Sequence, residues 1–240
     1  MSWQPVYWMG RTMVGLYTSL ALEMDIVHQA GWPAGPKIVA ANHPTTTDPF
    51  FLLSIVPEQM SILVTGMAFE VPVFGDYLRA AEHIPVMDGQ GTVALEQAVR
   101  QLERGRAIGI FPEGALSPLT GGLGFHPAHT GTVRLALSTR APIVPVGIGL
   151  DTARIQFAEV TAATQSETAR WYTSGPYALT VGRAIYLDGE IDDLAYVRSA
   201  SQHVMQTIAH LAHQSSQRIR ERKLRLRTRL LGRRGAAERA

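Results

Sequence analysis

The chain contains no cysteine, and this absence excludes disulfide bonds, thiolate-bound metals and a covalent cysteine nucleophile. It also contains neither of the glycine-rich phosphate-binding patterns, G-x-x-x-x-G-K-[ST] and G-x-G-x-x-G. The G-x-S-x-G turn that carries the nucleophile of α/β-hydrolases is missing as well. These absences argue against an α/β-hydrolase and against a glycine-rich phosphate loop.

Long hydrophobic runs are also scarce. Near the N-terminus, Arg11 and Glu23 enclose eleven uncharged residues, whereas a helix needs about 20 to cross the hydrocarbon core. No positively charged segment precedes them and no clear small-residue cleavage site follows, so a signal peptide is not expected. Residues 3–28 are predicted to be helical. That helix either packs on the domain or lies in a membrane interface, with Trp and Tyr at headgroup depth.

Charge is unevenly distributed along the chain. The net charge is +2, yet residues 216–240 hold ten Lys/Arg and two acidic residues, whereas the preceding part holds twelve and eighteen. This basic tail alternates arginines with leucines and favours an anionic membrane surface over a solvated, partly disordered segment. It has no aromatic residue for base stacking and no recognisable nucleic-acid motif, so no nucleic acid is expected as a partner.

The 240 residues, 46% of them hydrophobic, suit one α/β domain with appendages. Apolar runs alternate with helical segments, which predicts a mostly parallel central sheet flanked by helices. Strands are expected at 37–42, 61–65, 83–87, 107–111, 143–150 and 177–187, and helices at 48–56, 93–103 and 127–138. Residues 72–81 are expected to form a short helix or a turn, and residues 192–231 one long helix or two. The stretch 151–175 shows no clear pattern. The expected division is an N-terminal helical membrane-interface segment (1–34), an α/β domain (35–190) and a C-terminal helix with a basic amphipathic tail (191–240).

The most informative stretch follows the first of these strands. Asn42-His43-Pro44 ends the apolar run, and Asp48 follows His43 by five residues. Pro44 disfavours a helical conformation at His43, so the histidine is expected at a strand-to-helix junction with the chain folding back toward Asp48. A carboxylate on one imidazole nitrogen fixes the tautomer and leaves the other nitrogen free to act as a base. Taken alone, the same residues also fit a turn in which the threonines and Asp48 cap a helix.

Two later motifs change that balance: Phe111-Pro112-Glu113-Gly114 and the proline-rich run 142–147, P-I-V-P-V-G. In this order and spacing, N-H-x4-D, F-P-E-G and P-I-V-P-V-G resemble the glycerolipid acyltransferase family, typified by 1-acylglycerol-3-phosphate acyltransferases. The resemblance covers roughly residues 35–190. It implies transfer of an acyl group from an acyl-CoA or acyl carrier protein thioester to the hydroxyl of a lipid acceptor, with no cofactor.

The resemblance also implies roles for individual residues. His43 is the expected base and Asp48 its orienting partner, while backbone N–H groups near Gly114 are candidates for holding the oxyanion. Glu113 is expected to hold the acceptor, and Thr45 stands where the family has a serine. Asn42 completes the set of substrate-binding residues. No metal site is expected, because His126 and His129 have no obvious further ligands nearby.

The chain departs from the family where cations are expected. The family usually carries a basic pair before its second motif, an arginine within that motif and an arginine just after F-P-E-G, and these are thought to hold the acceptor's phosphate. The corresponding stretches here contain no Lys or Arg: Val64–Met67, Ile84–Asp88 and Gly114–Ser117. Either Arg79 or another distant cation substitutes, or the acceptor bears no phosphate.

Two other functions remain open from the sequence, a non-catalytic lipid-binding relative and an acyl thioesterase that uses water as acceptor. Intact His43, Asp48 and Glu113 argue against the first. For all of these functions the protein is expected to associate with the cytoplasmic face of a membrane as a peripheral or monotopic protein.

Overall fold

The computed structural model describes residues 5–119, 124–162 and 165–237. The first two residues of the predicted helix 3–28 and the last three of the basic tail lie outside these residues. The helices and strands follow in the order α1 (Pro5–Ala21), β1 (Leu22–His28), β2 (Lys37–Ala41), α2 (Asp48–Ile55), β3 (Met60–Thr65), η1 (Gly66–Glu70), α3 (Phe74–Ala80), β4 (Ile84–Val86), α4 (Gly91–Glu103), β5 (Ala107–Ile110), α5 (Gly131–Thr139), β6 (Ile143–Leu150), η2 (Thr152–Arg154), β7 (Gln156–Ala162), β8 (Gln165–Trp171), β9 (Gly175–Val181) and α6 (Leu194–Ala237).

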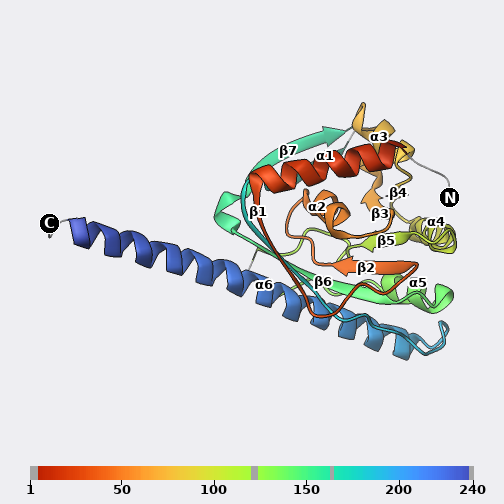
Figure 1. Ribbon diagram of the computed structural model, residues 1–240. Helices are drawn as coiled ribbons and strands as arrows, with labels where there is room; N and C mark the ends of the chain where they lie inside the picture. The colour runs from red at the N-terminus through yellow and green to blue at the C-terminus, as the bar shows by residue number, and fades with distance from the viewer. Residues whose placement is uncertain (1–4, 120–123, 163–164, 238–240) are drawn as a thin grey trace.

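Seven of the strands form one twisted sheet at the centre of the molecule (Figure 1). Their order is β1-β9-β6-β2-β5-β3-β4, and all neighbours run parallel except β6 and β9. Strands β7 and β8 form a separate antiparallel hairpin. The predicted α/β fold with a mostly parallel sheet is therefore confirmed. In such a sheet the loops that follow the parallel strands gather at one edge, where ligands bind.

The sheet is covered on both faces, which explains why its strands are almost continuously apolar. In β2, Val39 and Ala41 join a core cluster with side chains of α1 and α2, whereas Ile38 and Ala40 join a second cluster with α4, α5 and α6. Side chains of a strand alternate between faces, so each strand supplies both layers. Figure 1 shows α1 and α2 on one side of the sheet and α5 and α6 on the other.

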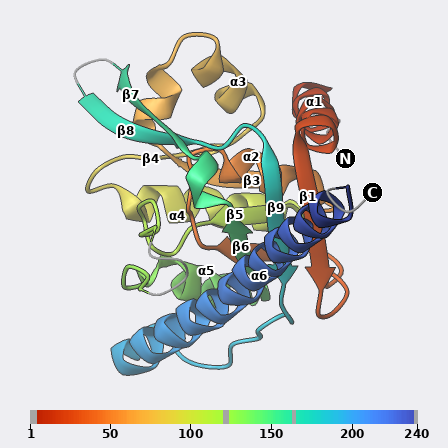
Figure 2. The ribbon, with the colours of Figure 1, turned by 90° about the vertical axis from the view of Figure 1, so that its left-hand side faces the viewer.

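Helix α6 lies against the middle of the sheet because two glycines in β6 let it approach closely. A Cβ on Gly147 would meet the Ala212 backbone at 2.0 Å, and one on Gly149 would meet the Ser216 backbone at 2.5 Å. The hydroxyl of Ser215 donates to the carbonyl of Gly147 at 2.8 Å and fixes the contact. Beyond this contact the helix extends past the sheet (Figure 1), and in Figure 2 it crosses the foreground.

Several element predictions need correction. Residues 22–28, predicted as the end of the first helix, form the edge strand β1, which pairs in parallel with β9. The expected helix 127–138 begins only at Gly131. The expected strand 177–187 is β9, which ends at Val181, and Ile185 adds only an isolated bridge to Ile143. The unpatterned stretch 151–175 holds η2 and the β7–β8 hairpin.

None of the helices in the described part of the chain is long and apolar enough to cross a membrane.

Candidate active site

The structure brings His43 and Asp48 together at the end of β2. Asn42 and His43 follow the last residue of that strand, and Asp48 is the first residue of α2. The short loop between them folds back so that Nδ1 of His43 lies 3.1 Å from Oδ2 of Asp48. Asp48 is fully buried, whereas the side chain of His43 is 17% exposed. One member of the pair is thus held inside the protein and the other reaches the surface.

Four polar groups surround the Asp48 carboxylate. Its Oδ2 accepts from the backbone N–H of Thr45 at 2.6 Å and faces Nδ1 of His43. Its Oδ1 accepts from the hydroxyl of Thr45 at 2.6 Å and from the phenol of Tyr177 at 2.8 Å. Since an ionised carboxylate only accepts hydrogen bonds, the same geometry places the imidazole proton on Nδ1. In the neutral imidazole, Nε2 then carries no proton and can act as a base.

Tyr177 could not be found from the sequence motifs, although it completes this network. It lies in β9 and is fully buried. Burial raises the pKa of its phenol well above the ordinary value, and the charge and hydrogen bond of Asp48 raise it further. The phenol therefore keeps its proton at neutral pH and remains a donor to Asp48.

The imidazole of His43 is held from the other side by the F-P-E-G segment. Its ring stacks on Phe111, with centroids 4.1 Å apart and planes inclined by 18°. The backbone N–H of His43 donates to the hydroxyl of Ser117 at 2.8 Å, and the His43 carbonyl accepts from the Ser117 N–H at 2.7 Å. These contacts join the loops of the two motifs into one unit around the base.

Glu113 is buried behind this unit. One of its oxygens accepts from the Ser117 hydroxyl and the other accepts from the backbone N–H of His126 at 3.0 Å. Both carboxylate oxygens thus hold the loop that carries Ser117. A direct contact of Glu113 with the acceptor stays a prediction, and in this structure the carboxylate positions the loop.

The remaining predicted substrate-binding residues also have internal partners. The amide of Asn42 exchanges two hydrogen bonds with the backbone of Ile148, at 3.0 and 2.7 Å, and so ties the motif to β6. Thr45 is fully buried against Asp48. The N–H of Gly114 donates to the Phe111 carbonyl at 3.0 Å, so it is not free for an oxyanion. Contact of any of them with substrate stays a prediction.

Gly114 matters for its conformation instead. Its φ of +64° lies in the left-handed region, which favours glycine, and a Cβ there would lie 2.8 Å from the His129 ring. Ala115 and Leu116 follow this turn and lie between Gly114 and Ser117, whose backbone N–H groups donate to the carbonyls of Phe111 and His43. The N–H groups of Ala115 and Leu116 have no hydrogen-bond acceptor among the described residues. They are therefore better placed than Gly114 to bind a negatively charged oxygen.

The cations near the site differ from those that the sequence motifs led us to consider. Arg79 donates to the Phe69 carbonyl at 2.7 Å and lies 3.6 Å from Glu70 and 3.4 Å from Asp76, so its charge is already compensated. Arg170, in β8, donates from Nη1 to the Ser117 carbonyl at 2.6 Å. No motif pointed to Arg170, because β8 lies in the stretch whose pattern could not be interpreted.

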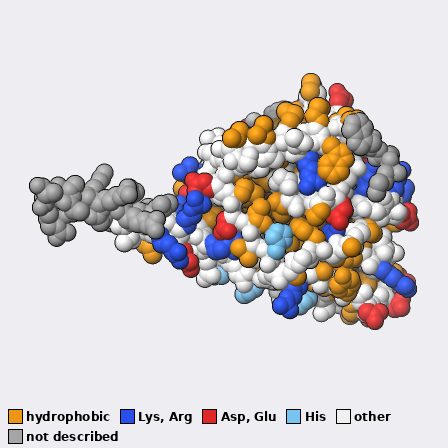
Figure 3. Space-filling view, viewed as in Figure 1, with side chains coloured by type: hydrophobic (Ala, Val, Ile, Leu, Met, Phe, Trp, Pro, Cys, Tyr) orange, Lys and Arg blue, Asp and Glu red, His pale blue; other side chains and the backbone are white. Residues whose placement is uncertain are grey.

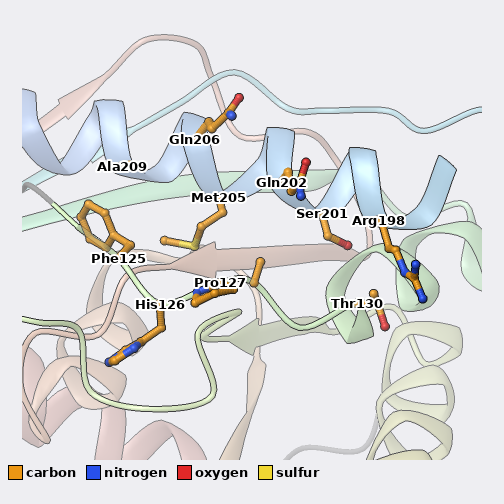
Figure 4. Close-up of a pocket in the computed structure, with 11 residues that line it drawn as sticks. Phe125, His126, Pro127, Thr130, Arg198, Ser201, Gln202, Met205, Gln206 and Ala209 are labelled. Carbon is orange, nitrogen blue, oxygen red and sulfur yellow. The ribbon is translucent and has the colours of Figure 1, made fainter. Parts of the chain in front are cut away.

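Two cavities flank the site on the side of α6. One, of about 250 Å³, is bordered by Asn42, Pro44 and Ser117, which surround His43 in the structure, and by Arg220 and Lys223 of α6. The other, of about 400 Å³, lies between α6 and residues 125–130, where Met205 faces the segment of Phe125 and Pro127 (Figure 4).

Within the described residues, no three His, Asp or Glu side chains are gathered in a way that could hold a metal ion.

Comparison with known proteins gives three results. A family model described as "Acyltransferase" matches residues 24–149. The 1-acyl-sn-glycerol-3-phosphate acyltransferase of Saccharomyces cerevisiae is 30% identical over a match that covers 53% of this chain and 43% of that protein, so the chain matches less than half of that relative's length. The crystal structure of the 1-acyl-sn-glycerophosphate (LPA) acyltransferase PlsC from Thermotoga maritima has a similar fold. Its TM-score is 0.54 at 19% identity, with 84% of this chain and 78% of that chain covered.

Proposed function

Because the chain belongs to the acyltransferase family, we propose that it transfers an acyl group from a thioester donor to a hydroxyl group of a lipid, with His43 as general base. The observation that carries this proposal is the geometry of the pair. The side chain of His43 reaches the surface, and its Nδ1 faces a buried carboxylate that three further donors hold in place. The family match, which includes both residues, supports it.

The reaction needs a base because a hydroxyl with a pKa near that of water, ~15.7, is a poor nucleophile. Free imidazole titrates near ~6.5, so proton removal accompanies attack instead of preceding it. Nε2 of His43 takes the proton while the acceptor oxygen bonds to the thioester carbon. The carbonyl oxygen becomes an oxyanion, for which the N–H groups of Ala115 and Leu116 are our candidate donors. The C–S bond then breaks, and the thiolate leaves with the proton that His43 returns.

Asp48 acts in this proposal through His43. It holds the tautomer with the proton on Nδ1 and stabilises the imidazolium that forms during attack. Thr45 and Tyr177 hold the carboxylate in turn, so that its orientation does not depend on His43 alone. The acceptor's alcohol is the proposed nucleophile, and water in its place would make the protein a thioesterase.

The acceptor is proposed to be a lipid alcohol without a phosphate monoester. A dianionic headgroup needs two or three cations, and hydrogen bonds to charged groups contribute about 1.5–3 kcal/mol each. The three stretches that carry such cations in the family carry none here, and Asp88 stands in the second. Arg79 does not fill the gap, because Glu70 and Asp76 already compensate its charge.

Membrane association is proposed through α1. One side of this helix packs on α2, while four large apolar side chains face solvent: Met9 at 60%, Met13 at 66%, Leu16 at 60% and Leu20 at 79% exposure. They recur at helical spacing and form a stripe, and Figure 3 shows hydrophobic side chains gathered over this side of the molecule. Trp8 and Tyr17 border the stripe and suit headgroup depth. In this proposal both interpretations of the helix apply, one to each face.

The basic tail is proposed as a second contact with an anionic lipid surface, but its first cations serve the fold. Arg218 pairs with Asp25 at 2.7 Å, Arg222 with Glu23 at 2.6 Å and Lys223 with Asp151 at 2.5 Å. These pairs dock α6 onto β1 and the end of β6. Contact with an anionic surface therefore falls mainly to the cations beyond Arg225. We also propose that the protein acts at the cytoplasmic face of the membrane and that its thioester donor is acyl-CoA or acyl carrier protein.

The test is incubation with labelled acyl-CoA and a panel of neutral, zwitterionic and phosphorylated lipid alcohols, with the products identified by mass spectrometry. The proposal expects a new ester on a lipid alcohol. Labelled free fatty acid as the sole product would make the protein a thioesterase, and binding of lipid without any product would make it a lipid-binding relative.

A further inference from the structure

Arg170 is a half-buried arginine beside the candidate base. Within the described part of the chain its side chain makes one hydrogen bond, from Nη1 to the carbonyl of Ser117 at 2.6 Å. Among the described residues, no Asp or Glu lies within ion-pair distance of its guanidinium. An arginine in such surroundings has lost part of its hydration without gaining a counter-charge. Its remaining N–H groups are available to an anion.

The backbone fixes where this guanidinium lies. The N–H of Arg170 donates to the hydroxyl of Thr46 at 3.0 Å, and its carbonyl accepts from the Thr46 N–H at 2.8 Å. Ser117, which the guanidinium reaches, is itself bonded to the backbone of His43 in both directions. Arg170 therefore spans the loop between His43 and Asp48 and the loop after F-P-E-G. Its charge lies at the edge of the proposed active site.

Arg170 brings a positive charge to a place where the sequence motifs supply none. The chain after F-P-E-G reads Ala-Leu-Ser, and Arg170 comes to that segment from the β7–β8 hairpin instead. A guanidinium binds phosphate oxygens through paired N–H groups and keeps its charge at all accessible pH values. A single arginine matches one negative charge, as carried by a phosphodiester, better than the two of a monoester.

We propose that Arg170 binds a singly charged phosphate group of a substrate next to His43. This inference rests on the proposed acyl transfer. Two substrates can supply such a group. One is the thioester donor, whose pantetheine arm ends in a phosphate linkage, and the other is an acceptor with a phosphodiester headgroup. The chemistry at Arg170 is the same in both cases, so the source is decided by experiment.

Two variants separate an anion site from a structural contact. Arg170→Gln removes the charge and keeps a side chain that can still donate to the Ser117 carbonyl. Thr46→Val removes the hydroxyl that accepts from the Arg170 backbone and leaves the guanidinium in place. Arg100→Gln, at an exposed position on α4, controls for loss of one positive charge. Thermal unfolding of each variant establishes that it is folded.

The activity experiment combines two donors with two acceptors. The donors are acyl-CoA and the acyl thioester of N-acetylcysteamine, which has no phosphate, and the acceptors are monoacylglycerol and lysophosphatidylglycerol. If Arg170 holds the donor, Arg170→Gln lowers kcat/KM at least about tenfold with acyl-CoA and either acceptor, but not with the short thioester. If it holds the acceptor, the loss follows lysophosphatidylglycerol with either donor. The factor corresponds to the loss of one charge-assisted hydrogen bond.

An equal loss in all four combinations, shared by Thr46→Val, would overturn the inference, because Arg170 would then only support the loops. So would unchanged kcat/KM in all four. Calorimetric binding of CoA and of lysophosphatidylglycerol to the wild type and to Arg170→Gln gives a readout without turnover. Binding that depends on Arg170 in a protein that forms no ester would refute the proposed function and keep the anion site. Ester formation that does not depend on Arg170 would support the proposed function and overturn the anion site.

Discussion

The phenol of Tyr177 donates a hydrogen bond of 2.8 Å to the carboxylate of Asp48, which lies 129 residues earlier in the chain. The contact joins β9 to the start of α2 beneath the candidate base. Because burial and the neighbouring carboxylate raise the pKa of Tyr177 well above its ordinary value, the phenol is protonated and a donor at neutral pH. It holds Asp48 in the orientation that faces Nδ1 of His43.

Tyr177→Phe is expected to lower kcat about tenfold and to lower the free energy of unfolding by about 1–3 kcal/mol. The carboxylate loses one donor to a buried charge, and such hydrogen bonds contribute ~1.5–3 kcal/mol. Tyr172→Phe is a matched control, since the Tyr172 phenol donates to the carbonyl of Pro176 and not to Asp48. Steady-state kinetics and urea unfolding check both. Equal effects on kcat in the two variants would show that Tyr177 has no particular link to the base.

Vesicle binding is expected to separate the contributions of α1 and the tail. Removing residues 226–240, which contain five arginines and one glutamate, should weaken binding to anionic vesicles at least tenfold, since each basic residue near the surface contributes ~1 kcal/mol. Replacing Leu16 and Leu20 with serine should weaken binding to anionic and zwitterionic vesicles alike. Co-sedimentation at low and high salt measures both, and salt should mimic only the truncation. The account of the two surfaces fails if the truncation acts equally on both vesicle types.

Acid is expected to destabilise the protein through His83. Burial lowers the pKa of this histidine to about 4, whereas in the unfolded chain it titrates near ~6.5. Between these values the unfolded state binds the extra proton, so the free energy of unfolding falls as pH drops from ~6.5 toward 4, by roughly 3 kcal/mol. Above ~6.5 this contribution is fully present.

His83→Gln should flatten that part of the stability profile, and His203→Gln, at an exposed position on α6, should leave it unchanged. Urea unfolding at several pH values between 4 and 7.5 provides the comparison. A profile as steep in His83→Gln as in the wild type would assign the acid sensitivity to other groups.

The acceptor is expected to change when a cation is restored to the loop after F-P-E-G. Leu116→Arg should raise kcat/KM for lysophosphatidic acid relative to monoacylglycerol about tenfold, because one charge-assisted contact to the phosphate is gained. The wild type should prefer the neutral acceptor. Competition between the two acceptors in one reaction gives the ratio directly. A strong preference of the wild type for lysophosphatidic acid would mean that a cation outside the three motifs already binds the phosphate monoester.

The local part of the fold could be predicted from the sequence, because strands buried on both faces are continuous apolar runs. The resemblance to acyltransferases is confirmed by the family match and the fold. The prediction of helix for residues 22–28 is wrong because these residues follow α1 without a turn residue. They are a strand through their pairing with β9, which no local pattern shows. The β7–β8 hairpin is mostly exposed on both of its faces, so it lacks the alternation that marks a half-buried strand.

The same limit applies to the site. His43 and Asp48 are five residues apart, so a local argument about the loop was enough to pair them. Tyr177 and Arg170 reach the site from β9 and β8, and their approach depends on how the whole sheet is assembled. Glu113 and Thr45 were expected to meet substrate, but a sequence motif does not tell which polar groups are already engaged inside the protein. In the structure their oxygens are bonded to Ser117, His126 and Asp48.

The most direct measurement is the single-turnover rate of acyl transfer in His43→Ala and Asp48→Asn, with circular dichroism spectra that match the wild type. The account predicts no detectable transfer in His43→Ala. In Asp48→Asn it predicts a loss of about 10⁴, as for a triad aspartate whose replacement leaves the wrong tautomer, because an amide cannot accept from Thr45, Tyr177 and His43 together. Wild-type rates in both variants would show that another group removes the proton, and would contradict the account.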